Sequence, residues 1–230
     1  MNDLEWHYLN GNGDFRSAEI KRLRDEADII ITNPPFSLFR EFLAWIVEAN
    51  KLFVIIGSKN AITYKEVFPL IKANQMWIGT TSFSKDMLFL PPEGIDLKSK
   101  PSTATRIIDG TMFLRAPSVW STNIEHGRRH QPLQLMTMAD NLKYSKHKEI
   151  KGASGYQKYD NYDAIEVPFT DAIPSDYDGV MGVPISFLDK YCPEQFEIVK
   201  FRHGNDGKDL RLNNGFQPYF RILIRHRKAV

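Results

Sequence analysis

The sequence has little cysteine and no long hydrophobic run. Its 230 residues include a single cysteine, Cys192, which excludes an internal disulfide framework and indicates a reducing compartment. No apolar run approaches the roughly 20 residues that a membrane helix needs, and the polar amino terminus lacks the apolar core of a signal peptide. We therefore expect a cytoplasmic protein without a membrane partner.

The chain also lacks a strong excess of charge of either sign. Its 30 Lys and Arg residues against 28 Asp and Glu residues leave a formal net charge of +2, which is too small to indicate a nucleic-acid partner by itself. No metal site is expected either: His126 and His130 are four residues apart, but Gly127 between them favours a loop. Hydrophobic residues make up 42% of the chain, as in an ordinary globular protein.

The first 90 residues contain apolar runs that alternate with amphipathic segments. The runs at 27–33, 51–57 and 76–81 are apolar without alternation, which is typical of parallel strands covered on both faces. Helices are predicted before the first run and between the runs. Ser17 and Ser37 are each predicted to cap the amino terminus of the helix that follows. The pattern predicts a β-α-β-α-β unit, the second half of a doubly wound α/β sheet.

The remainder of the chain has a different composition and different predicted elements. A polar loop at 91–106 precedes a predicted hairpin at 107–124, and a basic, tyrosine-bearing stretch leads to closing strands near the carboxyl terminus. We therefore predict two regions: a partial catalytic core at 1–90 and a loop- and strand-rich extension at 91–230.

The segment Asn33-Pro34-Pro35-Phe36 ends the first predicted strand. Two prolines remove two backbone donors, and each holds the residue before it in an extended conformation. The strand must therefore stop at a rigid polar corner, at the strand end where open α/β sheets bind ligands. A turn that merely ends the strand is the alternative.

This corner suits one kind of substrate. The Asn33 side chain and the Pro34 carbonyl can accept both hydrogens of a planar exocyclic amine, while Phe36 packs against the ring that carries it. Such a grip orients a weak ring amine for attack on a sulfonium methyl group. The chemistry predicted is methyl transfer without a metal.

The corner and the blocks around it resemble a known family. N-P-P-F after a strand resembles the motif of S-adenosylmethionine-dependent enzymes that methylate adenine N6. Longer blocks, which together cover essentially the whole chain, look like the EcoRI-type adenine-specific DNA methyltransferase family; they are GDFRSAEIKRLRDEADIIITNPPFSLFREF, IIGSKNAITYKEVFPLI, WSTNIEHGRR, YDNYDAIEVPF, DYDGVMGVPISFLDKYCPEQFEIV and PYFRILIR.

The resemblance implies a Rossmann-like class I methyltransferase of a restriction-modification or phage type, which acts on a flipped adenine in double-stranded DNA. It implies catalytic roles for Asn33, Pro34, Pro35 and Phe36. It places Asp14 and Phe15, together with Asn33, beside the cofactor S-adenosylmethionine.

The chain departs from the family pattern at its amino terminus. Family members carry, upstream of the block that contains Asp14, a glycine-bearing loop and an acidic residue that hold the cofactor. We therefore expect an amino-terminally truncated methyltransferase with an open sheet edge, in need of a fragment supplied by another chain. The alternatives are a catalytically silent DNA-binding remnant, or a methyltransferase that acts on an RNA base or a glutamine amide.

Candidate DNA contacts lie in the extension. Lys and Arg side chains would neutralise phosphates, and a few polar side chains would reach base edges, among which Gln131 is plausible. Each of these residues could instead be a solvated surface group. The candidates are Asn123, Arg128, Arg129, Lys143, Lys146 and Lys148.

Overall fold

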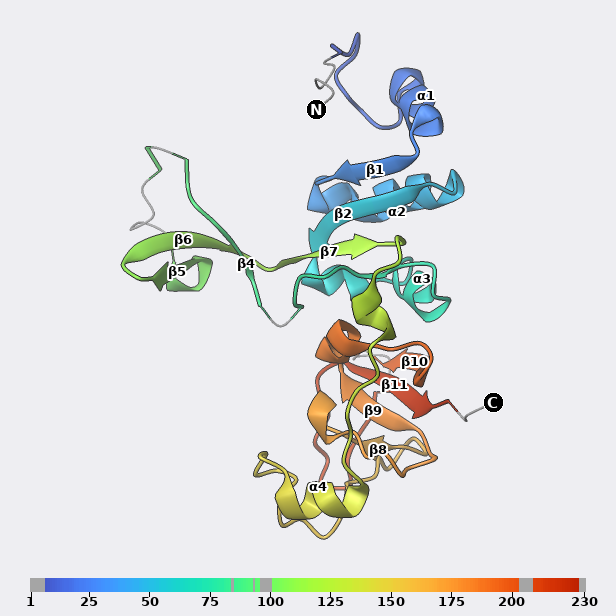
Figure 1. Ribbon diagram of the computed structural model, residues 1–230, viewed down its shortest axis with the longest axis vertical. Coiled ribbons are helices and arrows are strands. Elements are labelled where there is room, and N and C mark those ends of the chain that lie inside the picture. Colours follow the sequence, from blue (N-terminus) through green and yellow to red (C-terminus); the bar gives the residue numbers. More distant parts are fainter. Residues whose placement is uncertain (1–6, 84, 93, 96–100, 203–208, 228–230) are drawn as a thin grey trace.

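The computed structural model describes residues 7–83, 85–92, 94–95, 101–202 and 209–227. Figure 1 shows an elongated molecule with one sheet near the top, a second sheet near the bottom, and a third that protrudes sideways. Within the described residues, no helix is both long and apolar enough to cross a membrane.

The upper sheet contains four strands in the order β1-β2-β7-β3. Its strands are β1 (Ile29–Thr32), β2 (Leu52–Ser58), β3 (Trp77–Ile78) and β7 (Ser118–Thr122). β1 and β2 pair in parallel, whereas β7 runs antiparallel to both β2 and β3. A mixed α/β fold is confirmed, and the three predicted strands exist. They do not form a wholly parallel sheet, because β7 separates β2 from β3.

β7 also links the two predicted regions. It lies beyond residue 90, yet it pairs with β2 over five residues, from Val54 opposite Thr122 to Ser58 opposite Ser118. The upper sheet therefore draws strands from both sides of the boundary placed at residue 90.

Helices cover the upper sheet. They are α1 (Ala18–Glu26), α2 (Phe39–Glu48) and α3 (Phe68–Lys72), with short 3-10 turns η1 (Phe36–Leu38) and η2 (Lys59–Thr63). Ser17 caps α1 as predicted, because its hydroxyl accepts from the Ile20 amide. The predicted Ser37 cap is wrong: Ser37 lies inside η1, and α2 begins after Leu38 without a side-chain cap.

The core of this part lies between α2 and β2. Phe39, Leu43 and Ile46 of α2 are buried with Phe53 and Ile55 of β2. The expectation that the first strand is covered on both faces is wrong in this structure, because β1 is an edge strand with exposed isoleucines.

The lower sheet has the order β10-β11-β9-β8. It comprises β8 (Ile165–Glu166), β9 (Met181–Pro184), β10 (Phe196–Arg202) and β11 (Arg221–His226), with η6 (Ile185–Lys190), the short turn η5 (Thr170–Ala172) and α4 (Met138–Tyr144) beside them. The closing strands predicted from the sequence are confirmed. Both sheets share one core, and Phe68 of α3 meets Phe201 of β10 with ring centroids 5.0 Å apart.

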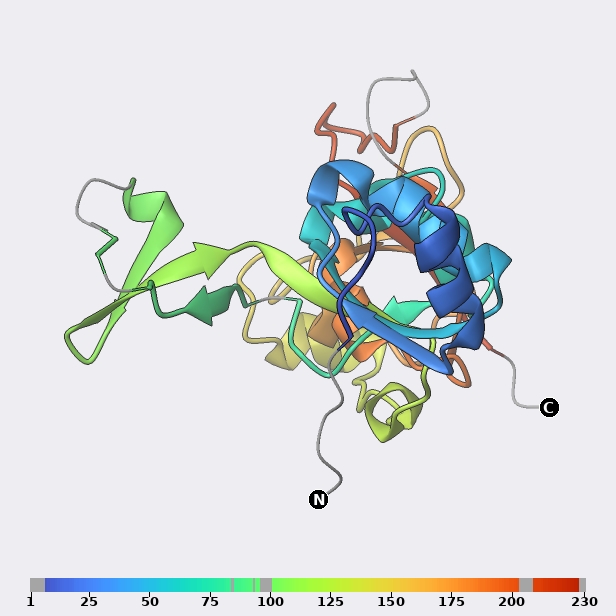
Figure 2. The same cartoon turned by 90° about the horizontal axis from the view of Figure 1, so that it is seen from above.

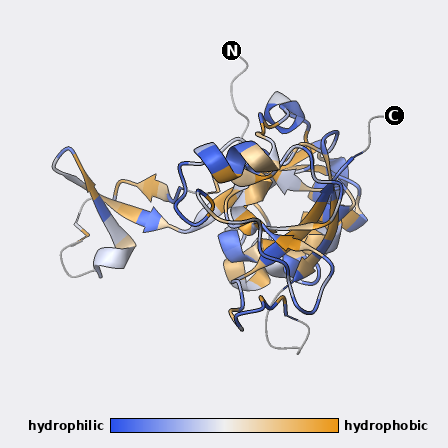
Figure 3. Ribbon diagram, turned by 90° about the horizontal axis from the view of Figure 1, so that it is seen from below, coloured by the Kyte–Doolittle hydropathy of each residue, from blue (hydrophilic) through white to orange (hydrophobic). Residues whose placement is uncertain are grey.

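A three-stranded sheet of order β4-β6-β5 protrudes from the body (Figure 2). Its strands are β4 (Met87–Phe89), β5 (Thr105–Ile108) and β6 (Thr111–Ala116), preceded by the turn η3 (Ser102–Ala104). The hairpin predicted at 107–124 is confirmed only in part. β5 and β6 form a hairpin that turns at Asp109 and Gly110, whose φ angles of 49° and 78° suit a type I′ turn, whereas the end of the predicted segment, β7, pairs in the upper sheet instead. Figure 3 shows that much of this arm is hydrophobic.

Candidate functional site

The polar corner lies at the carboxyl end of β1. Thr32, opposite Ile55, is the last paired residue of the strand, and Asn33 to Pro35 lead directly into η1 and α2. The predicted succession of strand, corner and helix is confirmed. Because β1 and β2 run in parallel, their carboxyl ends share one edge of the sheet.

The corner is open to solvent on its polar and aromatic sides. Asn33 is exposed, Pro34 is buried, and the Phe36 ring is 45% exposed. Among the residues that the structure describes, none hydrogen-bonds to the Asn33 side chain or to the Pro34 carbonyl, whereas the Pro35 carbonyl accepts from the Leu38 amide at 2.9 Å. The two acceptors that could hold an amine are therefore available.

The loop before α1 is held firmly against α2. The Glu19 carboxylate accepts from the backbone amides of Asn10 and Gly11 at 2.8 and 2.9 Å. The Arg16 guanidinium donates two bonds to Glu41, at 2.7 and 2.8 Å, and thereby lowers the pKa of that carboxyl. Asp14 accepts from the Arg16 amide. These contacts position the segment that contains Phe15.

Phe15 and the end of β1 line a common apolar pocket of about 370 Å³. The Phe15 ring meets Phe42 and Trp45 edge-on, with centroids 5.2 and 5.6 Å apart. Gly13 and Thr32 complete the wall nearest the corner. The structure thus brings the segment of Asp14 and Phe15 next to the strand that carries Asn33.

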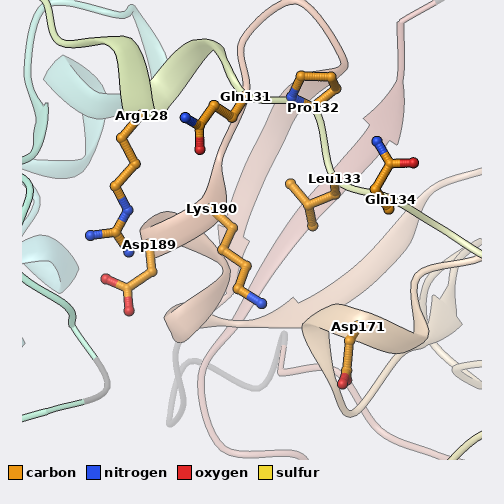
Figure 4. Close-up of a pocket in the computed structure, with 8 residues that line it drawn as sticks. All are labelled: Arg128, Gln131, Pro132, Leu133, Gln134, Asp171, Asp189 and Lys190. Carbon is orange, nitrogen blue, oxygen red and sulfur yellow. The ribbon is translucent and has the colours of Figure 1, made fainter.

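A second hollow, of about 390 Å³, lies below the upper sheet (Figure 4). One wall comes from η4 (Gly127–His130) and the extended segment after it, and the other from η6 and η5. The Arg128 guanidinium donates to the Thr80 carbonyl at 2.5 Å. The lining residues are Arg128, Gln131, Pro132, Leu133, Gln134, Asp171, Asp189 and Lys190. We call this hollow the recognition groove.

Two of the expected DNA contacts are instead used inside the fold. The Asn123 side chain accepts from the Phe53 amide at 2.8 Å and donates to the Lys51 carbonyl at 2.9 Å. Arg129 is 8% exposed, and its guanidinium lies 3.9 Å from the centre of the Trp77 ring. Both side chains already have partners in the fold, so we leave both out of the contacts proposed below.

The three candidate lysines are exposed, but they lie far from the corner. Lys143, Lys146 and Lys148 belong to α4 and the segment after it, at the opposite end of the molecule from β1 (Figure 1). Lys146 pairs with Asp171 at 2.6 Å. The structure therefore does not bring these lysines to the corner.

The histidines of the basic stretch serve separate contacts. His126 bonds the Ile78 carbonyl at 3.0 Å, and His130 lies between Glu125 and Glu194 at 2.8 and 2.9 Å. In the part of the chain that the structure describes, no group of three or more His, Cys, Asp and Glu side chains is arranged to hold a metal ion.

The chain is similar to known DNA methyltransferases. A family model described as "Adenine-specific methyltransferase EcoRI" matches residues 1–227. Type II methyltransferase M.EcoRI of Escherichia coli is 47% identical over 99% of the chain, which spans 66% of the length of that relative. Type II methyltransferase M.MpnI of Mycoplasma pneumoniae is 35% identical over 96% of the chain, which spans 71% of it. No solved structure matches.

Proposed function

Because the chain belongs to the EcoRI family of adenine-specific methyltransferases, we propose that it carries the target-binding part of a DNA adenine-N6 methyltransferase. The methyl donor is S-adenosylmethionine and the substrate is double-stranded DNA. The observation that carries the proposal is the exposed corner at the end of β1, where the Asn33 side chain is free to bind an amine beside the exposed Phe36 ring.

The corner can perform three tasks on an adenine that has left the base stack, as a duplex substrate requires. The side-chain carbonyl of Asn33 and the backbone carbonyl of Pro34 accept the two amine hydrogens. Phe36 stacks on the ring and limits its rotation. With both hydrogens held, the amine lone pair is directed away from the corner, toward the methyl donor.

The residues near β1 suit part of the cofactor. Phe15 and the apolar pocket beside it offer a surface on which a flat ring such as adenine can lie. Bound S-adenosylmethionine would supply an electrophilic methyl group. We propose that its charged methionine portion is held by groups outside the described residues, and that the described chain alone therefore binds it weakly.

The groups that hold the methionine portion of the cofactor would join the sheet at its edge strand, β1. In the described part of the chain, β1 pairs with β2 only, and it exposes Ile29 and Ile31. An apolar edge strand is a template for another strand. We propose that an upstream segment, in the same chain or in a second one, pairs here and completes a doubly wound sheet.

The test is transfer of a labelled methyl group from S-adenosylmethionine to unmethylated duplex DNA. The purified chain is assayed alone and with the upstream segment of M.EcoRI fused before it. We expect activity in the fused form, and Asn33→Ala should lower kcat by roughly 100-fold or more, the effect of removing one well-aligned polar contact. Asn213→Ala, at another exposed asparagine, serves as the control.

Three results would count against the proposal. They are an inactive fused form that is folded, a fused form that methylates another position, and an Asn33→Ala variant that keeps the parental kcat. The unfolding midpoint of Asn33→Ala should match that of the parent, because its side chain has no partner among the described residues.

A silent DNA-binding remnant is the second candidate. The free edge of β1 and its exposed isoleucines favour it, because they indicate an incomplete cofactor side. A titration with S-adenosylmethionine separates the two functions: saturable binding by the fused form supports the enzyme, and no binding at millimolar cofactor supports the remnant.

A further inference from the structure

The recognition groove combines a rigid backbone with polar side chains for which the described part of the chain offers no partner. Leu133, at its centre, is clamped by the Gln195 side chain, which accepts from the Leu133 amide at 2.7 Å and donates to the Leu133 carbonyl at 3.0 Å. Pro132 also holds Gln131 in an extended conformation. The segment that lines one wall is therefore fixed in place.

The opposite wall is braced as well. Asp189 accepts from the Ser82 hydroxyl at 2.9 Å and from the Phe83 amide, while on the first wall Arg128 donates to the Thr80 carbonyl. The groove thus joins the upper sheet to the lower sheet through hydrogen bonds on both sides. A surface that must read a duplex benefits from such rigidity, because less conformational entropy is lost on binding.

Three polar side chains of the groove are available to a ligand. The two carboxylates of the groove are already engaged: Asp171 pairs with Lys146 and His147, and Asp189 holds the loop at Ser82. In contrast, within the described residues the exposed side chains of Gln131, Gln134 and Lys190 have no hydrogen-bond or ionic partner. These three groups are free to bind.

The free groups match the edges of base pairs. A glutamine amide can bind adenine through one donor and one acceptor, and a lysine ammonium can bind the acceptors of guanine. Gln131 and Gln134 both line the groove and are separated by Pro132 and Leu133, so the two amides can address separate bases.

We propose that the recognition groove reads bases of the duplex that contains the target adenine, with Gln131, Gln134 and Lys190 as contacts to base edges and Arg128 as a residue that positions the segment. This inference rests on the proposed function, because it takes double-stranded DNA as the partner. It adds Gln134 and Lys190 to the proposed DNA-binding surface.

The experiment is selection of bound duplexes from a randomised double-stranded library by the purified chain, followed by titration of the selected and a scrambled duplex. We expect the parent to prefer the selected sequence. Gln131→Ala and Gln134→Ala should each reduce that preference by about fivefold or more, with unchanged affinity for the scrambled duplex. Gln75→Ala, at an exposed glutamine outside the groove, should leave the preference unchanged.

The outcomes separate this inference from the proposed function. If the sequence preference of the parent survives both substitutions while the fused form still transfers methyl groups, the proposed role of the groove is wrong and the proposed function stands. Binding without any sequence preference, or no binding, also overturns it. Loss of preference in both variants, together with an Asn33→Ala variant that retains activity, would support the groove and count against the catalytic corner.

Discussion

Two strands that each contain three consecutive branched apolar residues have opposite environments in this molecule. Ile222, Leu223 and Ile224 of β11 are completely buried, whereas Ile29 and Ile31 of β1 are 46% and 69% exposed. β11 pairs with β10 on one side and β9 on the other, but β1 pairs with β2 alone in the described part of the chain. An apolar run therefore determines that a strand forms, while its position in the sheet determines how much of it is buried.

The helices differ in burial in the same way as these two strands. α1, the helix nearest β1, has no buried residue, whereas α2 contributes Phe39, Leu43 and Ile46 to the core. The apolar face of α1 therefore lacks part of the packing contacts that an amphipathic helix usually makes. The upper sheet is well packed at β2 and incomplete at β1, and the lower sheet is packed throughout its centre.

The first prediction tests this comparison in the core. Leu223→Ala should lower the free energy of unfolding by about 2–5 kcal/mol, because it removes apolar contacts and leaves a cavity. Ile31→Ala should cost less than about 1 kcal/mol, since the side chain is already largely in water. Urea unfolding followed by fluorescence measures both, and equal losses would contradict the assignment of β1 as an uncovered edge.

A second prediction compares two ion pairs. Arg221 and Glu166 lie 2.6 Å apart with side chains 13% and 8% exposed, and the Tyr159 hydroxyl also donates to Glu166. Glu166→Ala leaves a buried guanidinium and phenol without their acceptor, which should cost about 3–5 kcal/mol.

Glu41→Ala is the matched control for that pair. It removes the partner of Arg16 on an exposed surface, where water replaces the lost contact, so the unfolding midpoint should barely move. A large loss for Glu41→Ala would mean that the loop of Asp14 and Phe15 is a folding element as well as a site element.

Local features of this fold could be predicted from the sequence. The Ser17 cap, the Asp109-Gly110 turn and the corner at Pro34 depend on a few neighbouring residues, and a single sequence contains those. The insertion of β7 between β2 and β3 could not be predicted in this way, because it depends on pairing across 60 to 68 residues.

The two asparagines show the same limit within the candidate sites. Asn33 and Asn123 carry the same amide, and both were candidates for contacts with substrate. The Asn33 side chain has no hydrogen-bond partner among the described residues, whereas the Asn123 side chain bonds backbone groups of Phe53 and Lys51. Only the first of these outcomes depends on adjacent residues, which is why it alone could be read from the sequence.

The smallest predicted effect concerns the joint between the two sheets. His130 bonds Glu125, just after β7, and Glu194, just before β10. These carboxylates, Glu125 most strongly, raise the pKa of His130 above its usual value near 6.5. Its contribution to stability is therefore fully present below about pH 6.5 and is lost as the pH rises through the raised pKa. The effect is small because the side chain is exposed.

His130→Gln removes this titration and leaves the other histidines in place. The difference in unfolding midpoint between parent and variant, measured in urea from pH 5.5 to 8.5, should shrink as the pH rises. A difference that stays constant would show that the contacts of His130 do not depend on its proton. A difference that shrinks would mean that the recognition groove, one residue away at Gln131, is held more firmly at acidic pH, because the same carboxylates tie the upper sheet to the lower one.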